Sequence, residues 1–442
     1  MSDTARSSFE SSPLIREIRE LLGRGAVTDA ETRLRNAPES AERWYLCGIV
    51  ANRKRDHHQA AVALRRAIEL RPDAALSWLA LGTSLARSNA WREAADAYRA
   101  AIERDPGMAD AHLNLGIALK RLGESLSAMR SLYTAWSRDP MLFDAARQCV
   151  ATIAEHVRTC DSPEVKTSHA AFSRAHSFTI VICSIDDRKC ARAVALYRRL
   201  FADFPHELVV VRDARSLASA YNAAADNARG EFVLLSHDDI DILEDGFAAR
   251  IAWLLSNEFD VVGVIGSTRL DGPVIGWSGH PNLRGWITHH GGKESCWEVD
   301  LLDPQPVSRG VVALDGVLIG ARRDVLRALP FDAATFDGFH LYDLDWSYRV
   351  SQAGFRMGVA GDLLVVHQSR GTYGDAWERY ARRFCAKHGV GHERARMSSF
   401  FGATLDSAAH ARAFFDVLRA LAGSAGGSTD RCGRRPIHVE FG

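Results

Sequence analysis

Small and apolar positions recur with a fixed period along the first third of the chain. Pro38, Pro72, Pro106 and Pro140 are each 34 residues apart. The small residues that keep this register are Gly48, Gly82 and Gly116, Ala60, Ala94 and Ala128, and Ala67, Ala101 and Ala135. Small side chains let paired helices approach closely, and a proline closes each second helix. A period of 34 residues corresponds to one helix pair. The pattern therefore predicts an α solenoid.

The same register sets the expected boundaries of this domain. We expect three full repeats over about 41–142, preceded by a degenerate first repeat and N-terminal cap in 1–40. Residues 141–156 are expected to form a capping helix, because a solenoid needs an atypical end. The repeat domain then spans 41–158. Residues 159–177 are rich in Ser and His without a long apolar run, which predicts a linker.

These columns, with Trp44, Trp78 and His112 sharing one further position, resemble the tetratricopeptide repeat family. The resemblance implies a concave surface that binds a peptide or partner protein. Self-association through the repeats is an equal alternative. The tryptophans are expected to fill the core rather than contact a ligand.

Beyond residue 178 the pattern changes to β-rich runs that alternate with amphipathic helices. Apolar runs at 178–184, 207–211 and 231–235 are separated by helical segments at 187–201 and 216–227. This alternation predicts a Rossmann-like α/β domain with a mostly parallel sheet over 178–390. The third run leads directly into His237, Asp238 and Asp239. Because α/β sheets bind ligands at the carboxyl ends of their strands, these three side chains mark a candidate site.

Composition narrows the class of protein. Lys+Arg and Asp+Glu both total 55, so no overall charge attracts nucleic acid. No apolar run reaches the roughly 18 residues of a membrane span. The eight cysteines form no Cys-x-x-Cys pair, which is typical of reduced thiols in a cytoplasmic protein. Peripheral contact with the inner face of a membrane stays open.

Several motifs of the second domain occur in the order found in one enzyme family. A strand ending at Asp213, then Ser219-Ala220-Tyr221-Asn222, Gly230-Glu231-Phe232 and His237-Asp238-Asp239 resemble the first half of a GT-A fold, family-two-like glycosyltransferase. His237 stands where the family's metal-binding Asp-x-Asp motif has its first acid.

The second half of the domain agrees with this resemblance. Residues 311–323 resemble the strand that borders the donor sugar. Tyr342-Asp343-Leu344-Asp345, followed by Arg349, resembles the family's Glu-Asp-x-Asp-x-x-x-Arg helix start, with Tyr342 in place of Glu. Residues 361–367 form a run that ends at His367, where many GT-A enzymes keep a metal ligand.

The resemblance implies a metal-dependent transfer of a sugar from a nucleotide-diphosphate donor to a glycan or protein acceptor, with inversion. Asp239 and His367 are the expected ligands of Mn²⁺ or Mg²⁺, and Asp343 is the expected catalytic base. Donor contacts are expected from Ser184, Asp186, Asp213, Asn222, His237, Asp238, Asp315 and Gly316.

Each assignment has a simpler alternative. His367 could be a strand-end histidine bonded to nearby backbone. Asp343 could be a helix cap, although Asp345 in the same turn could take that role. The whole domain could bind a sugar nucleotide without turnover, in an interaction or scaffold protein.

Two further segments carry weaker signals. Residues 263–306 look loop-like and contain aromatic side chains suited to an acceptor wall or lid. These are Trp277, His280, Trp286, His289, His290 and Trp297. The His289-His290 pair lacks the spacing of a zinc site. In residues 391–442 we expect one helix, at 406–421, and a disordered tail from residue 423.

Overall fold

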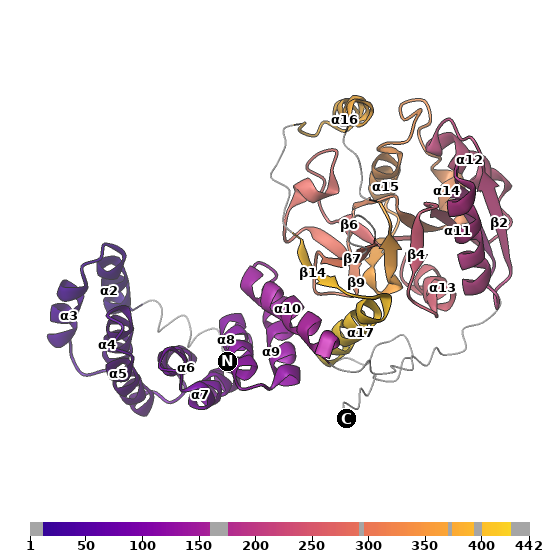
Figure 1. The fold of residues 1–442 in the computed structure, drawn as a ribbon. Coiled ribbons are helices and arrows are strands. Elements are labelled where there is room, and N and C mark those ends of the chain that lie inside the picture. Colours follow the sequence, from indigo (N-terminus) through magenta and orange to yellow (C-terminus); the bar gives the residue numbers. More distant parts are fainter. Residues whose placement is uncertain (1–11, 160–175, 291–295, 370–373, 393–399, 426–442) are drawn as a thin grey trace. The chain divides into compact units, whose positions relative to one another are not determined.

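The computed structural model describes residues 12–159, 176–290, 296–369, 374–392 and 400–425. The chain divides into two compact units, residues 1–152 and 153–442 (Figure 1). The expected linker 159–177 and the expected tail from residue 423 lie almost entirely outside the described residues.

The first unit is the predicted solenoid of antiparallel helix pairs. The two helices of each pair pack against each other, with α4 on α5, α6 on α7 and α8 on α9. The helices are α2 (Pro13–Gly23), α3 (Val27–Arg35), α4 (Ala41–Arg53), α5 (His57–Leu70), α6 (Ala75–Arg87), α7 (Trp91–Arg104), α8 (Ala109–Arg121) and α9 (Ser125–Arg138). A further helix, α10 (Phe143–Thr159), follows at the expected place of the capping helix.

The glycine column explains the repeat period physically. A Cβ atom on Gly48 would lie 2.4 Å from the Leu64 side chain, and one on Gly82 would lie 2.6 Å from the Tyr98 ring. Real Cβ atoms do not come this close to other atoms. Only glycine therefore lets the two helices of a pair reach this separation.

The second unit is an α/β domain around a mixed sheet. The order of its main sheet is β2-β1-β3-β11-β5-β12-β9. The expected parallel pairing holds for β1 (Phe178–Cys183), β2 (His206–Val211) and β3 (Phe232–Ser236). From β11 (Leu318–Arg322) onward the sheet is mixed, since β11 runs antiparallel to both β3 and β5 (Val261–Gly263). The edge is completed by β12 (Met357–Ala360) and β9 (Val307–Arg309).

Helices cover both faces of this sheet. On one face, α11 (Asp187–Leu200) and α13 (Phe247–Asn257) pack on alternate side chains of β1 and β3. The other face is covered by α12 (Leu217–Asn227), α14 (Arg323–Ala328), α15 (Tyr342–Gln352) and α16 (Asp375–His388). This layering leaves the carboxyl ends of β1 and β3 available for a site.

A second sheet occupies the region that looked loop-like, so that expectation was wrong. Its order is β10-β6-β7-β13-β4, and β8 pairs with both β7 and β14. Its strands are β4 (Ile240–Ile242), β6 (Ile265–Ser267), β7 (Leu283–His290), β8 (Trp297–Leu301), β10 (Ala313–Leu314), β13 (Val365–His367) and β14 (Phe401–Leu405). The segments 275–278 and 361–363 form the short helices η1 and η2.

The expected C-terminal helix is present as α17 (Ala408–Ala425), drawn in yellow in Figure 1. Arg419 of α17 is buried and forms an ion pair with Glu244. Arg419 also donates a hydrogen bond of 2.7 Å to the carbonyl oxygen of Asp362. The helix is therefore part of the α/β core. Among the helices of the described ranges, none combines the length and apolar character needed to cross a membrane.

Candidate active site

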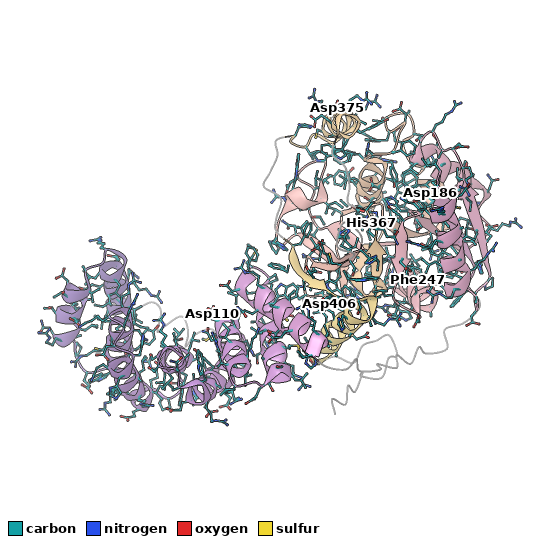
Figure 2. The ribbon with its side chains drawn as sticks, in the orientation of Figure 1. Asp110, Asp186, Phe247, His367, Asp375 and Asp406 are labelled. Atoms are coloured by element: carbon teal, nitrogen blue, oxygen red, sulfur yellow. The ribbon has the colours of Figure 1, made fainter. Side chains whose placement is uncertain are left out.

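Three potential metal ligands meet where β3 ends. His237 and Asp239 follow β3, and His367 ends β13, which pairs with β4 immediately after Asp239. The Oδ1 atom of Asp239 lies 3.3 Å from Nε2 of His367 and 3.9 Å from Nδ1 of His237. One ligand atom from each residue lies within 4.8 Å of the others. Figure 2 labels His367 within the α/β domain, where its side chain is 13% exposed.

The charges in this cluster favour a negative Asp239 beside a neutral His237. Burial would raise the pKa of Asp239, but hydrogen bonds from His367 and Ser369 outweigh burial and hold the pKa well below its usual range. Burial lowers the pKa of His237, and the neighbouring His367 lowers it further. Deprotonated carboxylate and neutral imidazole are the forms that ligate metals.

The donor set fits a divalent cation. It offers one carboxylate oxygen and two imidazole nitrogens. Nitrogen donors suit Mn²⁺ better than Mg²⁺, which prefers an all-oxygen shell. His237, expected among the donor contacts, lies in the metal cluster. His367 contacts Asp239 and the Ser369 hydroxyl, at 3.3 and 3.2 Å.

Two residues close to Asp239 and His367 were not predicted from the sequence. The ammonium group of Lys189, in the first turn of α11, lies 3.7 Å from Oδ2 of Asp239. The second is Ser369, whose hydroxyl contacts His367. Neither residue lies in one of the motifs, although Lys189 follows the expected helix start at residue 187.

The expected donor contacts near β1 form a connected group. The Ser184 hydroxyl donates a 2.6 Å hydrogen bond to Oδ2 of Asp238. Asp186 is exposed and its Oδ1 atom accepts hydrogen bonds from the amides of Arg188 and Lys189, so it caps α11. Asp213 is exposed at a left-handed turn with φ 52°.

The side chain of Asn222, another expected donor contact, is hydrogen-bonded to backbone. Its amide nitrogen donates to the carbonyl of Phe331 at 2.9 Å, and its Oδ1 atom accepts from the Phe331 amide at 2.8 Å. Both polar groups are thus occupied by backbone. Asn222 therefore anchors the loop before α15, and its expected contact with the donor stays a prediction.

Asp343 lies in the first turn of α15 and faces the turn between β10 and β11. Its Oδ2 atom accepts a 2.7 Å hydrogen bond from the amide of Gly316. Burial and the adjacent Asp315 carboxylate raise the pKa of Asp343 to about 7. Asp315 in turn accepts a 3.0 Å hydrogen bond from the amide of Val317. A carboxyl group with a pKa near 7 is suited to general base catalysis.

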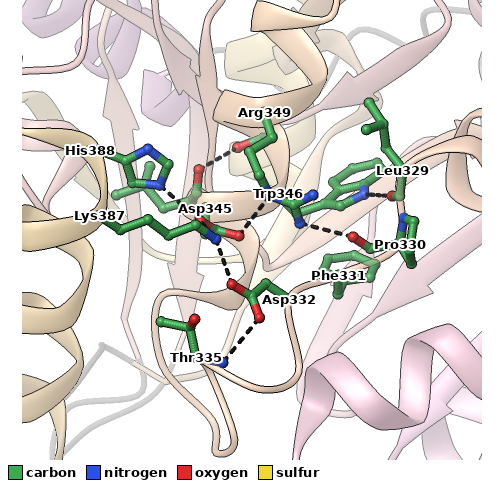
Figure 3. Close-up of polar contacts among 12 residues, drawn as sticks. Leu329, Pro330, Phe331, Asp332, Thr335, Asp345, Trp346, Arg349, Lys387 and His388 are labelled. Carbon is green, nitrogen blue, oxygen red and sulfur yellow. Dashed lines mark hydrogen bonds and ion pairs between the residues drawn. The ribbon is translucent and has the colours of Figure 1, made fainter.

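The Asp345 side chain is engaged in ion pairs rather than in the helix cap that it could have formed. Its side chain is fully buried and forms ion pairs with Arg349, Lys387 and His388 at 2.9, 2.6 and 2.8 Å (Figure 3). Burial would raise the pKa of Asp345, but hydrogen bonds from His388 and Lys387 outweigh it and lower the pKa. Leu341 occupies the N-cap position without a side-chain cap. The network joins α15, which carries Asp343, to α16.

Asp332 extends the same network. Its Oδ2 atom lies 2.7 Å from the Lys387 ammonium, and its Oδ1 atom accepts a 3.0 Å hydrogen bond from the Thr335 amide (Figure 3). The Trp346 indole donates to the Leu329 carbonyl at 2.6 Å. The loop before α15 is thus fixed at several points.

Two of the aromatic residues expected in an acceptor wall or lid over 263–306 are buried in the core. Trp286 is fully buried, stacks on Phe415 of α17 and donates a 2.9 Å hydrogen bond to the Asp303 carbonyl. Trp277 is also buried. His290 and Trp297 pack together, with ring centroids 4.2 Å apart. Trp277 and Trp286 are therefore buried, and the rings of Trp286, His290 and Trp297 pack against other side chains.

Comparison with known proteins agrees with both halves of this architecture. Residues 179–388 match the model of a glycosyltransferase like family. Residues 48–98 and 79–140 match the tetratricopeptide repeat. No curated protein matches the chain.

Solved structures similar to this chain include those of two repeat proteins. YrrB, described as a TPR protein with an unusual peptide-binding site, is 26% identical over 29% of this chain and 68% of its own, with a TM-score of 0.27. MamA from Desulfovibrio magneticus is 19% identical over 32% of this chain and 83% of its own, with a TM-score of 0.30. The family matches establish that the chain carries tetratricopeptide repeats over 48–140 and a glycosyltransferase family 2-like domain over 179–388.

Proposed function

We propose that the α/β domain is a metal-dependent, inverting glycosyltransferase that moves a sugar from a nucleotide-diphosphate donor to an acceptor hydroxyl. The observation that carries this proposal is the group of His237, Asp239 and His367 at the end of β3, in a domain that also holds Asp343 with a raised pKa. A scaffold protein would need neither a preformed ligand set nor a tuned carboxylate.

The ligand cluster would hold Mn²⁺ or Mg²⁺ through the carboxylate of Asp239 and the imidazoles of His237 and His367. A divalent cation supplies Lewis-acid stabilisation of the diphosphate leaving group. Lys189 adds a fixed positive charge beside the cluster, 3.7 Å from Asp239. Ser184 and Asp238, joined by their hydrogen bond, would contact the nucleoside.

Asp343 would accept the proton of the attacking hydroxyl. The Gly316 amide donates to Oδ2 of the carboxylate and so fixes the orientation in which the group would meet the acceptor. Attack by an activated hydroxyl opposite the leaving group inverts the anomeric carbon. At neutral pH a large fraction of a carboxyl group with a pKa of about 7 is ionised and basic.

A donor screen with and without Mn²⁺ tests this function against a scaffold role. The screen measures release of nucleoside diphosphate from a panel of nucleotide sugars by mass spectrometry. The enzyme hypothesis expects release that depends on both the metal and an acceptor. Donor binding without any turnover, across donors and acceptors, would favour the interaction protein.

The repeat unit would dock a partner or the acceptor, and a groove on its surface indicates the chemistry. A cavity of about 770 Å³ lies between α4 and α6. Tyr45, Ile49, Leu76 and Leu79 give it an apolar floor. Its polar lining contains Arg53, Arg55, Arg87 and His57 but no carboxylate. This combination suits a peptide that carries both acidic and apolar side chains.

Charge reversal tests the groove. Arg53→Glu with Arg87→Glu should weaken binding of a fluorescein-labelled Asp/Glu-Leu peptide at least tenfold in fluorescence anisotropy. The matched control is Arg99→Glu on α7, whose guanidinium pairs with Asp96. Equal affinity in the double mutant would exclude this groove. Sedimentation of the unliganded protein separates peptide docking from self-association.

A further inference from the structure

Two buried tyrosine hydroxyls lie behind the proposed base without hydrogen-bond partners. Tyr342, the residue that precedes Asp343, is 4% exposed, and Tyr221 of α12 is 1% exposed. Their ring centroids are 5.7 Å apart at 62°. Neither hydroxyl has a partner of full hydrogen-bond geometry among the described residues, although the Tyr342 hydroxyl is close enough to Tyr221 to oppose part of the effect of burial on the Tyr221 pKa. A buried hydroxyl without a partner costs about 1–3 kcal/mol, so this arrangement calls for a compensating role.

Gly316 brings one of these hydroxyls next to the Asp343 carboxylate. A Cβ atom built on Gly316 would lie 2.7 Å from Oδ2 of Asp343 and 2.8 Å from the Tyr342 hydroxyl oxygen. The two oxygens therefore flank the same point above Gly316. The Tyr342 hydroxyl makes no hydrogen bond to this carboxylate in the described structure, so such a bond requires one of the two side chains to rotate.

The charges around Asp343 decide which way this hydrogen bond runs. The titratable groups that act on Asp343 and Tyr342 are Asp315 in the β10–β11 turn, Tyr221 on α12 and Cys183 at the end of β1. Burial raises the pKa of Tyr342 and Tyr221 well above the usual value, so both hydroxyls stay protonated. A protonated tyrosine can donate to a carboxylate.

We propose that Tyr342 is a positioning residue whose hydroxyl donates a hydrogen bond to the Asp343 carboxylate when that group is charged. This inference rests on the proposed function of Asp343 as base. Tyr342 replaces an acid that the sequence motif would otherwise place beside Asp343. The tyrosine replaces a repulsive negative charge with a hydrogen-bond donor. This donor opposes the rise in the Asp343 pKa that burial and Asp315 cause.

Direct titration of Asp343 tests the inference independently of activity. The protein is labelled with ¹³C at its aspartate carboxyl groups, and the Asp343 signal is assigned by its loss in Asp343→Asn. Tyr342→Phe keeps the ring that packs on Tyr221 and Phe331 but removes the donor. The pKa of Asp343 should rise by about half to one unit, the equivalent of one hydrogen bond. Tyr348→Phe, on the same helix, should leave it unchanged.

A second variant covers the case in which Tyr342→Phe does not fold. Site-specific 3-fluorotyrosine at position 342 strengthens the donor and should lower the pKa of Asp343. An unchanged or lower pKa in Tyr342→Phe, or an unchanged or higher pKa with fluorotyrosine, would overturn the inference. If these shifts occur but no donor is ever turned over, the positioning role stands and the transferase proposal fails. Turnover without the shifts would support the transferase and reject the positioning role of Tyr342.

Discussion

The Nε2 atom of His367 lies 3.3 Å from Oδ1 of Asp239, although the two residues come from strands far apart in the sequence. The pairing of β13 with β4 sets this distance, because His367 is the register partner of Ile240, the residue after Asp239. The two ligands are therefore fixed by the second sheet as well as by β3. We regard this contact as the basis of the proposed metal site.

Removal of a ligand should weaken metal binding directly. His367→Ala and Asp239→Asn should each reduce Mn²⁺ affinity at least about tenfold in isothermal titration calorimetry. The control is His206→Ala. His206 lies in β2 and its ring contacts the Phe204 carbonyl, so this variant should bind Mn²⁺ normally. Unchanged affinity in both ligand variants would remove the metal site.

Loss of the proposed base should affect turnover rather than donor binding. Asp343→Asn should lower kcat about 10²–10⁴-fold, while the Kd for the donor changes less than about twofold. Asp337→Asn changes an exposed acid just before the same helix, which pairs with Arg383, and should have little effect. Nearly wild-type kcat in Asp343→Asn would contradict the assignment.

The raised pKa of Asp343 also predicts a pH-dependent cost to stability. The folded protein binds this proton more tightly than the unfolded chain, so the protonated form is stabilised. The stabilisation is complete below about pH 4 and is lost as pH rises through about 7. The change for a shift from 3.8 to about 7 is at most about 4 kcal/mol.

Asp343→Asn removes this titration. The variant should therefore gain stability relative to wild type between pH 4 and pH 8, as measured by urea unfolding at each pH. A constant difference between the two proteins across this range would show that the pKa of Asp343 is not raised.

Gly316 should tolerate no side chain. The methyl group of Gly316→Ala would lie 2.7 Å from Oδ2 of Asp343 and 2.8 Å from the Tyr342 hydroxyl, so both must move. We expect kcat to fall at least about tenfold, since small displacements of a base are costly. Gly374→Ala is the control, because nothing lies within 4 Å of its added Cβ. Equal activities would show that this turn adapts freely.

The α/β domain should fail to fold when it is cut at residue 390, just beyond the family match that ends at residue 388. A chain ending at residue 390 lacks α17, and it exposes the buried carboxylate of Glu244 that pairs with Arg419. Loss of one partner of a buried ion pair costs about 3–5 kcal/mol. Arg419→Met should therefore lower Tm strongly, whereas Arg412→Met, which breaks an exposed pair with Asp245, should not. A cooperative, stable 1–390 fragment would contradict this role.

The repeating and strand-rich parts of the fold could be predicted because each carries its signal locally. The repeated glycine lies where the two helices of a pair touch, as Gly48 does against Leu64, and it recurs in each repeat. The strands β1, β2 and β3 are apolar runs between helices of ordinary length. Their boundaries in the structure lie within a residue or two of those expected.

The second sheet was missed because glycine, histidine and tryptophan dominate β7. Its sequence, Leu-Arg-Gly-Trp-Ile-Thr-His-His, looks like a loop, and only its pairing with β6, β8 and β13 makes it a strand. The tertiary partners of Asn222 and Asp345 lie far away in the sequence. No local sequence pattern predicts that Asn222 bonds to the Phe331 backbone or that Asp345 pairs with Lys387.

The candidate site was predictable in part, through resemblance rather than local pattern. Asp239 follows β3 and Asp343 begins α15, so a short stretch of sequence around each was enough to match a family motif. Lys189, Ser369 and the role of His237 beside the metal ligands depend on how β3, β13 and α11 converge. That convergence follows from sheet register.

Turnover of the donor by matched variants tests the central claim most directly. Release of nucleoside diphosphate is measured with Mn²⁺ and an acceptor, for wild type, Asp343→Asn and His367→Ala, each with and without EDTA. We predict rapid release by wild type that EDTA abolishes, and rates reduced at least about a hundredfold in both variants. Equal release by all three proteins, or release by wild type that EDTA leaves unchanged, would contradict the proposed active site.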